Sequence, residues 1–496
     1  MRYRSTRDIK NCPHYVSAAE AIKEGLAPDG GLYIPEKMPK LTCDDIKKLI
    51  GMTYAERASF ILGLFLDDYD ASALSADCAE AYSEKRFPGG AAPIHEMKDG
   101  IYSLELWHGP TSAFKDMALQ IMPRLLSRAL SMTGERRIAH ILVATSGDTG
   151  KAALEGYKNV PGVKITVFYP VDGVSRMQKL QMQTTLGDNV YVAAVRGNFD
   201  DAQNGVKAIF ADRALAEKAD KNGFFFSSAN SINWGRLAPQ IVYYVSAYCD
   251  LINDGKISMG DKINIAVPTG NFGNIFAAYI AREIGIPVNR FICASNSNNV
   301  LTDFINTGVY DRTREFYKTI SPSMDILISS NLERLISVLS DPKTTASLME
   351  ELKEKGKYTA SAALMEKIRS LFSAYSMNET ETKQTIADSF NNEAYLIDPH
   401  TAVGLGCVKK YRAETGDSTP TVLASTASPY KFAPAVSEAL GLDVSGSEED
   451  FMPLLKKLSE KTSTEIPAPL LRTLTMNVRF SETIDPSDMP ALPFRV

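Results

Sequence analysis

The chain contains few cysteines, and none of them lies close to another. The six cysteines stand singly at positions 12, 43, 78, 249, 293 and 407, and the five histidines are as widely dispersed. Disulfide frameworks and structural zinc sites need such residues in closely spaced groups. We therefore expect no metal site and no disulfide, and free thiols of this kind are typical of a reducing compartment.

Long hydrophobic runs and clustered positive charge are also missing. No stretch reaches the roughly 18 consecutive apolar residues of a membrane-spanning helix, and the opening residues MRYRSTRDIKNCPHY lack the apolar core of a secretory signal. The net charge of −5 gives no basic surface for nucleic acid or for an acidic membrane. The sequence predicts a cytoplasmic protein that binds neither nucleic acid nor membranes.

The 496 residues, 44% of them hydrophobic, are too many for one ordinary core, and we expect two or three packed lobes. Short apolar runs alternate with helical patterns along most of the chain. The expected strands span 101–107, 138–144, 163–169, 190–195, 263–267 and 422–425. The expected helices include 116–132 with a kink at Pro123, 151–157 and 275–284. Buried strands that alternate with helices predict an α/β fold with parallel sheets.

The pattern changes at two places along the chain. Residues 1–95 form an expected N-terminal domain, in which the capping-box pattern Ser17-Ala-Ala-Glu20 begins a helix. Residues 96–496 form an expected core of two lobes. Within it, the stretch at about 332–390 is rich in serine, lysine and glutamate and is expected to be mostly helical.

Two of the expected strands lead through a glycine-containing turn into a helix. The turns are Thr145-Ser-Gly-Asp-Thr-Gly150 and Thr269-Gly-Asn-Phe-Gly-Asn274. Small residues let backbone N–H groups approach an anion, and the following helix adds the positive end of its dipole. Glycine at such a corner is also often a purely geometric requirement, so either turn alone leaves both interpretations open. Two turns at the carboxyl ends of strands, where ligands of α/β sheets bind, together favour an anion site.

The spacing of these turns disfavours a nucleotide. Gly147-Asp-Thr-Gly-Lys-Ala152 has the wrong spacing for a Walker loop and no hydroxyl residue after the lysine. Gly270-Asn-Phe-Gly273 is not the dinucleotide pattern GxGxxG, and no acidic residue ends a second strand about 20 residues further on.

Lys115 lies between an expected strand and an expected helix, in His108-Gly-Pro-Thr-Ser-Ala-Phe-Lys-Asp116. The dipole of a helix N-terminus disfavours the ammonium form of a lysine and makes a nucleophilic amine more available. Position alone would equally fit a solvated surface lysine. With two anion-binding turns, however, a nucleophilic lysine predicts pyridoxal 5'-phosphate (PLP), which offers a phosphate to cradle and an aldehyde to trap.

These segments are similar to those of one enzyme family. HGPTSAFKD at 108–116 resembles the PLP-lysine motif of threonine synthases, which are fold type II (tryptophan-synthase-β-like) PLP enzymes. Other segments resemble that family's signatures in the same order: YRSTR at 3–7, GLAPDGGLYIP at 25–35, ATSGDTGKAA at 144–153, NSINWGR at 230–236, PTGNFGN at 268–274, SPSMDILISSNLERL at 321–335 and DPHTAVG at 398–404. The resemblance covers nearly the whole chain, and it implies two parallel-sheet lobes plus an N-terminal segment.

The resemblance implies a cofactor site. Lys115 would hold PLP as a Schiff base. The positions that would contact the cofactor besides it are Asp148, Gly270, Asn271, Phe272, Gly273, Asn274 and Thr426. A carboxylate at Asp148 would meet the phenolic oxygen of the cofactor, so one of the two must carry or share a proton. Thr426 would meet the pyridine nitrogen; relatives commonly read TAHP there, whereas this chain has Ser428 in place of the histidine.

The resemblance also implies a substrate site. The positions that would grip the substrate carboxylate are Thr145, Ser146 and Thr149, and those that would bind a substrate phosphate are Asn230, Ser231 and Arg236. Arginine suits a phosphate through its forked, charge-assisted hydrogen bonds. The alternatives are loop capping for Asn230 and Ser231 and a surface ion pair for Arg236.

The implied activity is conversion of O-phospho-L-homoserine and water to L-threonine and phosphate, with Lys115 as general base at Cα. Two other functions stay open at this point. One is another reaction on the same fold, such as that of a serine/threonine dehydratase or a β-replacing synthase, neither of which needs a second phosphate pocket. The other is a non-catalytic protein that binds a phosphorylated metabolite. The sequence is compatible with a monomer or a homodimer.

Overall fold

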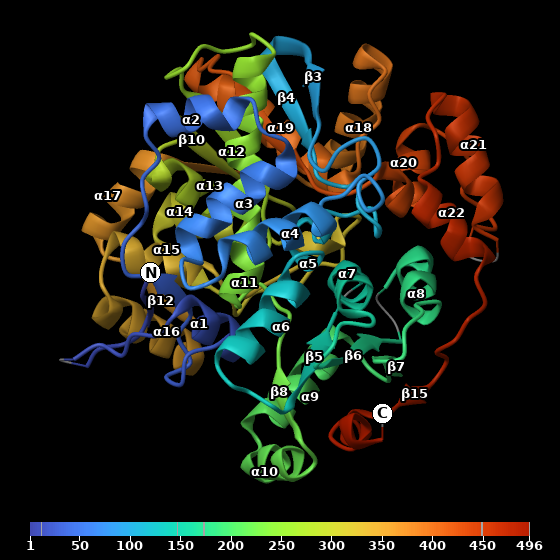
Figure 1. Cartoon of the computed structure of the whole chain (residues 1–496). Helices are drawn as coiled ribbons and strands as arrows, with labels where there is room; N and C mark the ends of the chain where they lie inside the picture. Colours follow the sequence, from blue (N-terminus) through green and yellow to red (C-terminus); the bar gives the residue numbers. More distant parts are fainter. Residues whose placement is uncertain (11, 146, 172–173, 448–449, 496) are drawn as a thin grey trace.

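Apolar runs rich in valine and isoleucine form the strands of two sheets, one in each lobe (Figure 1). The computed structural model describes residues 1–10, 12–145, 147–171, 174–447 and 450–495. Two further pairs of short strands lie outside these sheets: β1 (Tyr3–Ser5) with β2 (Tyr33–Pro35), and β11 (Val309–Asp311) with β12 (Lys357–Thr359). The α/β architecture with largely parallel sheets expected from the sequence is confirmed.

The larger sheet has six strands among the described residues. In spatial order they are β13 (Phe372–Ser376), β10 (Val288–Ser295), β9 (Ile263–Pro268), β14 (Thr421–Ser425), β4 (Ile101–Glu105) and β3 (Ile94–Met97). Neighbouring strands are parallel except β3, which is antiparallel to β4. The central strand β9 is buried along its whole length because helices pack on both faces of the sheet.

The smaller sheet has five strands within the described ranges, all parallel. In spatial order they are β15 (Thr483–Ile484), β7 (Val190–Val195), β6 (Val163–Pro170), β5 (Ile138–Ala144) and β8 (Phe224–Ser227). Alternate residues of β5 face different cores. Ile141 joins the central core, whereas Leu142 packs with α9 (Phe199–Ala211) on the outer face of this sheet. The C-terminal strand β15 returns to complete this sheet (Figure 1).

Helices surround both sheets. Those of the N-terminal segment are α1 (Ala18–Glu24), α2 (Cys43–Ile50), α3 (Tyr54–Phe65) and α4 (Ala71–Ala81). Those of the smaller lobe are α5 (Asp116–Leu119), α6 (Met122–Met132), α7 (Asp148–Tyr157), α8 (Arg176–Gln183), α9 (Phe199–Ala211) and α10 (Arg213–Lys221). Those that follow β8 up to β14 are α11 (Trp234–Leu237), α12 (Pro239–Asn253), α13 (Gly273–Ile284), α14 (Val300–Thr307), α15 (Leu332–Leu339), α16 (Pro342–Lys355), α17 (Ala362–Leu371), α18 (Glu379–Glu393) and α19 (Pro399–Thr415). The last three are α20 (Ala433–Ala439), α21 (Met452–Thr462) and α22 (Ala468–Thr475).

The expected helix over 116–132 is wrong as a single element. The structure has two helices there, α5 and α6, and Pro123 lies in the first turn of α6. Proline is favoured in a first helical turn because its missing N–H would have no partner there. The break therefore precedes the proline instead of falling on it.

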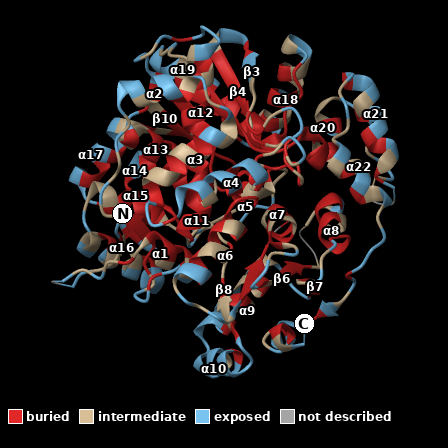
Figure 2. Cartoon of the chain, in the orientation of Figure 1, coloured by how far each residue is buried: buried red, intermediate tan, exposed pale blue. Residues whose placement is uncertain are grey.

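The largest cluster of buried hydrophobic residues joins the lobes and the N-terminal segment, and two smaller clusters lie beside it (Figure 2). Helices α2 and α3 pack on α12, and α1 packs on α6. By contrast, α10 is largely exposed (Figure 2). No helix of the described chain combines the length and apolar content needed to cross a membrane.

Candidate active site

Lys115 lies beyond the carboxyl end of β4, in the loop that leads into α5. The buried carboxylate of Asp116 closes this loop, because it accepts the backbone N–H of Thr111 at 2.7 Å and the Thr111 hydroxyl at 2.9 Å. Between them, Ser112 adopts a left-handed φ of 57°. The tight turn leaves Lys115 immediately before the first residue of α5.

The end of β14 lies against this loop. The N–H of Phe114 donates to the carbonyl of Thr426 at 2.8 Å, and the N–H of Ser428 donates to the carbonyl of Ser112 at 3.1 Å. Thr426 is buried. The structure thereby brings this predicted cofactor contact next to the loop of the predicted reactive lysine.

Asp148 begins α7, directly after the first glycine-containing turn. Its carboxylate is buried, and its Oδ1 lies 2.9 Å from the ammonium of Lys431. Ser323 donates to Oδ2 at 3.1 Å, and the Nζ of Lys115 lies 3.4 Å from the Ser323 hydroxyl. Four side chains from separate parts of the sequence thus converge at one point between the lobes.

The pKa values of Lys115 and Asp148 are both lowered at this point, for different reasons. Burial lowers the pKa of the Lys115 amine to about 8, although the Asp148 carboxylate opposes that shift. The positive charges of Arg236 and Lys431 add to the lowering. Burial would raise the pKa of Asp148, but Lys431 and Lys115 hold it well below its usual range. The site therefore combines an ionised carboxylate with an amine whose neutral form is accessible near neutral pH.

The second glycine-containing turn leads from β9 into α13. Phe272 adopts a left-handed φ of 62°, and a Cβ at Gly270 would lie 2.8 Å from the Ser323 carbonyl oxygen. The Oδ1 of Asn274 accepts two tyrosine hydroxyls, whereas its buried Nδ2 has no partner among the described residues. An unused amide donor at a helix N-terminus fits the phosphate of a cofactor.

Arg236 lies in α11, is only 5% exposed, and has no carboxylate partner in the part of the chain that the structure describes. Its Nη1 donates to the carbonyl of Ala229 at 2.6 Å. Burial lowers the pKa of Arg236 to about 10, which leaves it charged at neutral pH. A buried guanidinium without a counter-ion is costly unless an anion binds it. This geometry is unlike the surface ion pair that was the alternative for this residue.

The two other residues of the predicted phosphate group lie just before Arg236. Ser231 accepts a hydrogen bond from the side chain of Asn331 at 3.1 Å. Asn230 is partly buried, and its carbonyl accepts the N–H of Asn233 at 3.1 Å. Both therefore contribute to the loop itself, and their contact with a substrate phosphate stays a prediction.

The residues predicted to hold the substrate carboxylate lie in the turn before α7. The hydroxyl of Thr145 accepts the N–H groups of Gly147 and Gly150 at 2.9 and 3.0 Å, so it stabilises the turn. Thr149 is partly buried in the first turn of α7, and Ser146 lies outside the described residues. Contact of these three with a substrate stays a prediction.

Four residues at the site had no role in the sequence-based prediction. They are Gln178, Ser323, His400 and Lys431. Gln178 donates to Asp148 Oδ1 at 2.9 Å, and the N–H of Ser323 donates to Nε2 of His400 at 3.1 Å. Ser323 and His400 lie in the segments SPSMD and DPHTAVG, which resemble family signatures. The one local signal for Lys431 is its place within the apolar run Pro-Tyr-Lys-Phe.

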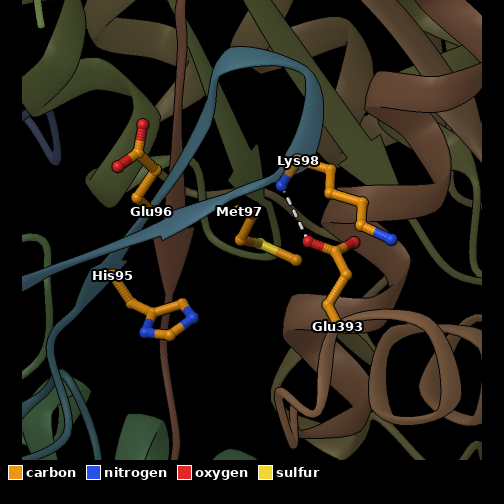
Figure 3. A pocket seen from close by; sticks show the side chains of 5 residues that line it. All are labelled: His95, Glu96, Met97, Lys98 and Glu393. Carbon is orange, nitrogen blue, oxygen red and sulfur yellow. Dashed lines mark hydrogen bonds between the residues drawn. The ribbon is translucent and has the colours of Figure 1, made fainter.

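A separate cavity lies at the outer edge of the larger sheet, near β3. It has a volume of about 310 Å³ and is lined by His95, Glu96, Met97, Lys98 and Glu393 (Figure 3). The N–H of Lys98 already donates to Glu393 at 2.7 Å (Figure 3). The lining of this cavity includes neither of the glycine-containing turns nor Lys115, so the candidate active site lies elsewhere. Among the described residues, no group of His, Cys, Asp and Glu is arranged to hold a metal ion.

Comparison with known families matches almost the whole chain. The family described as "Pyridoxal-phosphate dependent enzyme" matches residues 90–426. "Threonine synthase N terminus" matches residues 2–82, and "Threonine synthase, C-terminal" matches residues 401–469.

Individual relatives are named threonine synthase or threonine synthase-like. A threonine synthase of Pseudomonas aeruginosa is 39% identical over 441 residues, which cover 88% of this chain and 90% of that protein. A human protein named "Threonine synthase-like 1" is 40% identical over 489 residues, or 93% of this chain, and the chain spans 65% of that protein's length. Among solved structures, PLP-bound threonine synthase from Brucella melitensis is 34% identical with a TM-score of 0.87, and it covers 100% of this chain and 98% of that chain. Yeast threonine synthase is 32% identical with a TM-score of 0.86, covering 100% of this chain and 97% of that chain.

The two parallel-sheet lobes and the lysine between them define a fold type II PLP-dependent enzyme fold, whose cofactor is pyridoxal phosphate. Within that class, the chain belongs to the threonine synthase family.

Proposed function

We propose that the chain converts O-phospho-L-homoserine and water to L-threonine and phosphate. The observation that carries the proposal is Arg236, a buried guanidinium with no counter-ion among the described residues, close enough to Lys115 to lower its pKa. The turn at 270–274 supplies a separate anion site for the cofactor phosphate. A second cationic site nearby is what a phosphorylated amino-acid substrate requires.

The residues of the site would divide the work between cofactor and substrate. Lys115 would hold the cofactor, Asn274 and the N-terminus of α13 would bind its phosphate, and Thr426 would meet its ring. When bound, PLP supplies an electron-accepting ring that stabilises negative charge at the substrate Cα. Arg236 would hold the substrate phosphate in place and stabilise the charge that develops as phosphate leaves Cγ.

Once the substrate amine has displaced it from the cofactor, Lys115 would serve as the general base. A lysine base needs a neutral amine, and a pKa of about 8 supplies a useful neutral fraction near neutral pH. Its Nζ would take the proton from the substrate Cα. Ser323, 3.4 Å from Nζ, would hold the amine beside the Asp148 carboxylate. Departure of phosphate from Cγ also requires loss of a proton from Cβ, and water would add at Cβ after a proton has returned to Cγ.

The free cysteines fit a reducing compartment such as the cytosol. The six cysteines are unpaired, and four of them are buried. Burial raises the pKa of the Cys293 thiol to about 12. Thiols of this kind are inert and need no oxidising environment.

The test is a phosphate-release assay on O-phospho-L-homoserine, with and without added PLP. We expect cofactor-dependent release of phosphate with matching formation of threonine, and no release of ammonia from threonine. Ammonia release without phosphate release would instead identify a dehydratase. Cofactor bound to Lys115 with neither product would identify a non-catalytic binding protein.

Replacing Arg236 tests directly whether its buried guanidinium binds the substrate phosphate. Arg236→Met should lower kcat/KM for O-phospho-L-homoserine by about tenfold to a hundredfold, because a charge-assisted hydrogen bond to phosphate contributes about 1.5–3 kcal/mol. Cofactor affinity, measured by absorbance titration, should stay within about threefold of the wild-type value. An unchanged kcat/KM would remove Arg236 from the substrate site.

A further inference from the structure

Lys431 is the least expected residue at the site because its ammonium is almost fully buried. It is 1% exposed and lies in the short 3₁₀ helix Pro429–Phe432 that follows β14. Its Nζ donates to the carbonyl of Thr111 at 2.9 Å and lies 2.9 Å from Asp148 Oδ1. Burying an ammonium costs several kcal/mol unless its partners are well placed. Here one ammonium connects the loop of Lys115, through Thr111, to the turn of Asp148.

The two carboxylate oxygens of Asp148 have different neighbours. Oδ1 accepts both Lys431 and the side-chain amide of Gln178, each at 2.9 Å. Oδ2 accepts only the Ser323 hydroxyl among the described residues, at 3.1 Å. Because Lys431 and Gln178 occupy one oxygen, the other is directed toward Ser323 and Lys115.

The two lysines around Asp148 differ in whether they take part in the expected reaction. The Lys115 amine is the group expected to react, and it must be neutral before it can act as a base or a nucleophile. Lys431 has no such task, and its Nζ lies 2.9 Å from Asp148 Oδ1. Asp148 therefore has a lysine partner that takes no part in a reaction at Lys115.

We propose that Lys431 is a positioning residue, which keeps Asp148 ionised and turns its Oδ2 toward the cofactor side of the site. A fixed carboxylate at that point can only accept a hydrogen bond. Any oxygen of the cofactor that meets Oδ2 must then bring the proton. This inference rests on the proposed cofactor site but not on the proposed reaction. It can fail while phosphate release is still observed, and it can hold even if no phosphate is released.

The test uses the PLP-loaded protein and the pH dependence of the visible absorbance of the bound cofactor. In Lys431→Met, Asp148 loses its permanent cation and should titrate between about pH 5 and 9, because a buried carboxyl without a partner has a raised pKa. We expect an additional pH-dependent absorbance change, together with at least tenfold weaker PLP binding. The double variant Lys431→Met/Asp148→Asn has no group to titrate there and should lack the additional change.

Two controls separate this role from a merely structural one. Lys151 is also buried and pairs with Glu155 at 3.0 Å, so Lys151→Met removes a buried ammonium without touching Asp148 and should show no additional titration. Lys431→Arg keeps a cation beside Asp148 and should not show it either, which preserves the test if Lys431→Met does not fold. The proposal is overturned if Lys431→Met titrates like the wild type. It is equally overturned if Lys431→Arg, or the double variant, shows the same additional change as Lys431→Met.

Discussion

At the scale of single residues, the proposed chemistry depends on the Lys115 amine, whose positive charge is poorly stabilised. Burial lowers the pKa of Lys115 to about 8, and two nearby cations add to this shift. The neutral amine is the nucleophile, so it becomes available as pH rises through 8 and is lost below it.

The rate at which the cofactor-free chain captures PLP should follow this titration. We expect the rate to rise with a midpoint near pH 8, whereas an ordinary lysine would titrate near 10.4. Stopped-flow absorbance across pH 6–10 measures the rate, and Lys115→Ala provides the baseline without capture. A midpoint above about 10 would mean that the amine is not desolvated as described.

At the residue scale, a candidate site could be predicted only where the sequence carries a local signal. Lys115 and the turns at 145–150 and 270–274 each combine a short motif with a strand-to-helix junction, so they could be found from the sequence. Lys431 and Ser323 could not be assigned this role, because they reach Asp148 from segments 283 and 175 residues away. Ser323 lies in a segment that resembles a family signature, but nothing local in either segment points to Asp148. Their role follows only from the tertiary fold.

At the scale of elements, the site depends on how closely α7 packs on α5, the helix that directly follows Lys115. A Cβ at Gly156 of α7 would lie 1.9 Å from the carbonyl oxygen of Leu119, the last residue of α5. No side chain fits at that distance, so the two helices must separate to accept one.

Gly156→Ala should destabilise the fold by about 1–3 kcal/mol, as overpacking in a core does, and should weaken PLP binding because α5 moves. Gly63→Ala is the matched control: it is a helical glycine of α3 with nothing within 4 Å of the added Cβ. The control should leave stability equal or slightly higher, since alanine favours a helix by up to about 1 kcal/mol. Urea unfolding measures both, and equal stabilities would contradict this packing.

Among elements, long apolar strands were the easiest to predict. Strands β5 and β7 begin and end where the sequence pattern placed them. Strand β13 (Phe372–Ser376) was missed because it is short and partly polar, and it lies in the stretch 332–390 that was expected to be mostly helical. Its strand conformation comes from pairing with β10, which the local sequence does not encode.

At the scale of the whole molecule, the N-terminal segment is tied to the active-site loops through one buried arginine. Arg334 in α15 is fully buried and donates to the carbonyls of Tyr33 at 3.1 Å, Ser231 at 3.3 Å and Ile232 at 2.6 Å. It also donates to Asn331, whose side chain donates to the backbone carbonyl of Asn271 in the turn at 270–274, at 2.9 Å.

Arg334→Met should therefore lower the free energy of unfolding by about 3 kcal/mol or more, because several buried carbonyls lose their donors. It should also weaken PLP binding, since the loops at 230–236 and 270–274 lose a common support. Arg2→Met removes an exposed ion pair with Glu36 in the same segment and should change stability by less than about 1 kcal/mol. Similar losses in both variants would contradict the role of Arg334 as a connection between the segments.

The central claim is that Lys115 forms a covalent link to pyridoxal phosphate. Borohydride reduction of the PLP-loaded protein, followed by proteolysis and peptide mapping, tests it most directly. The account predicts one pyridoxyl group per chain, on the lysine of the peptide segment HGPTSAFKD. Labelling of another lysine, or no stable label after reduction, would contradict it.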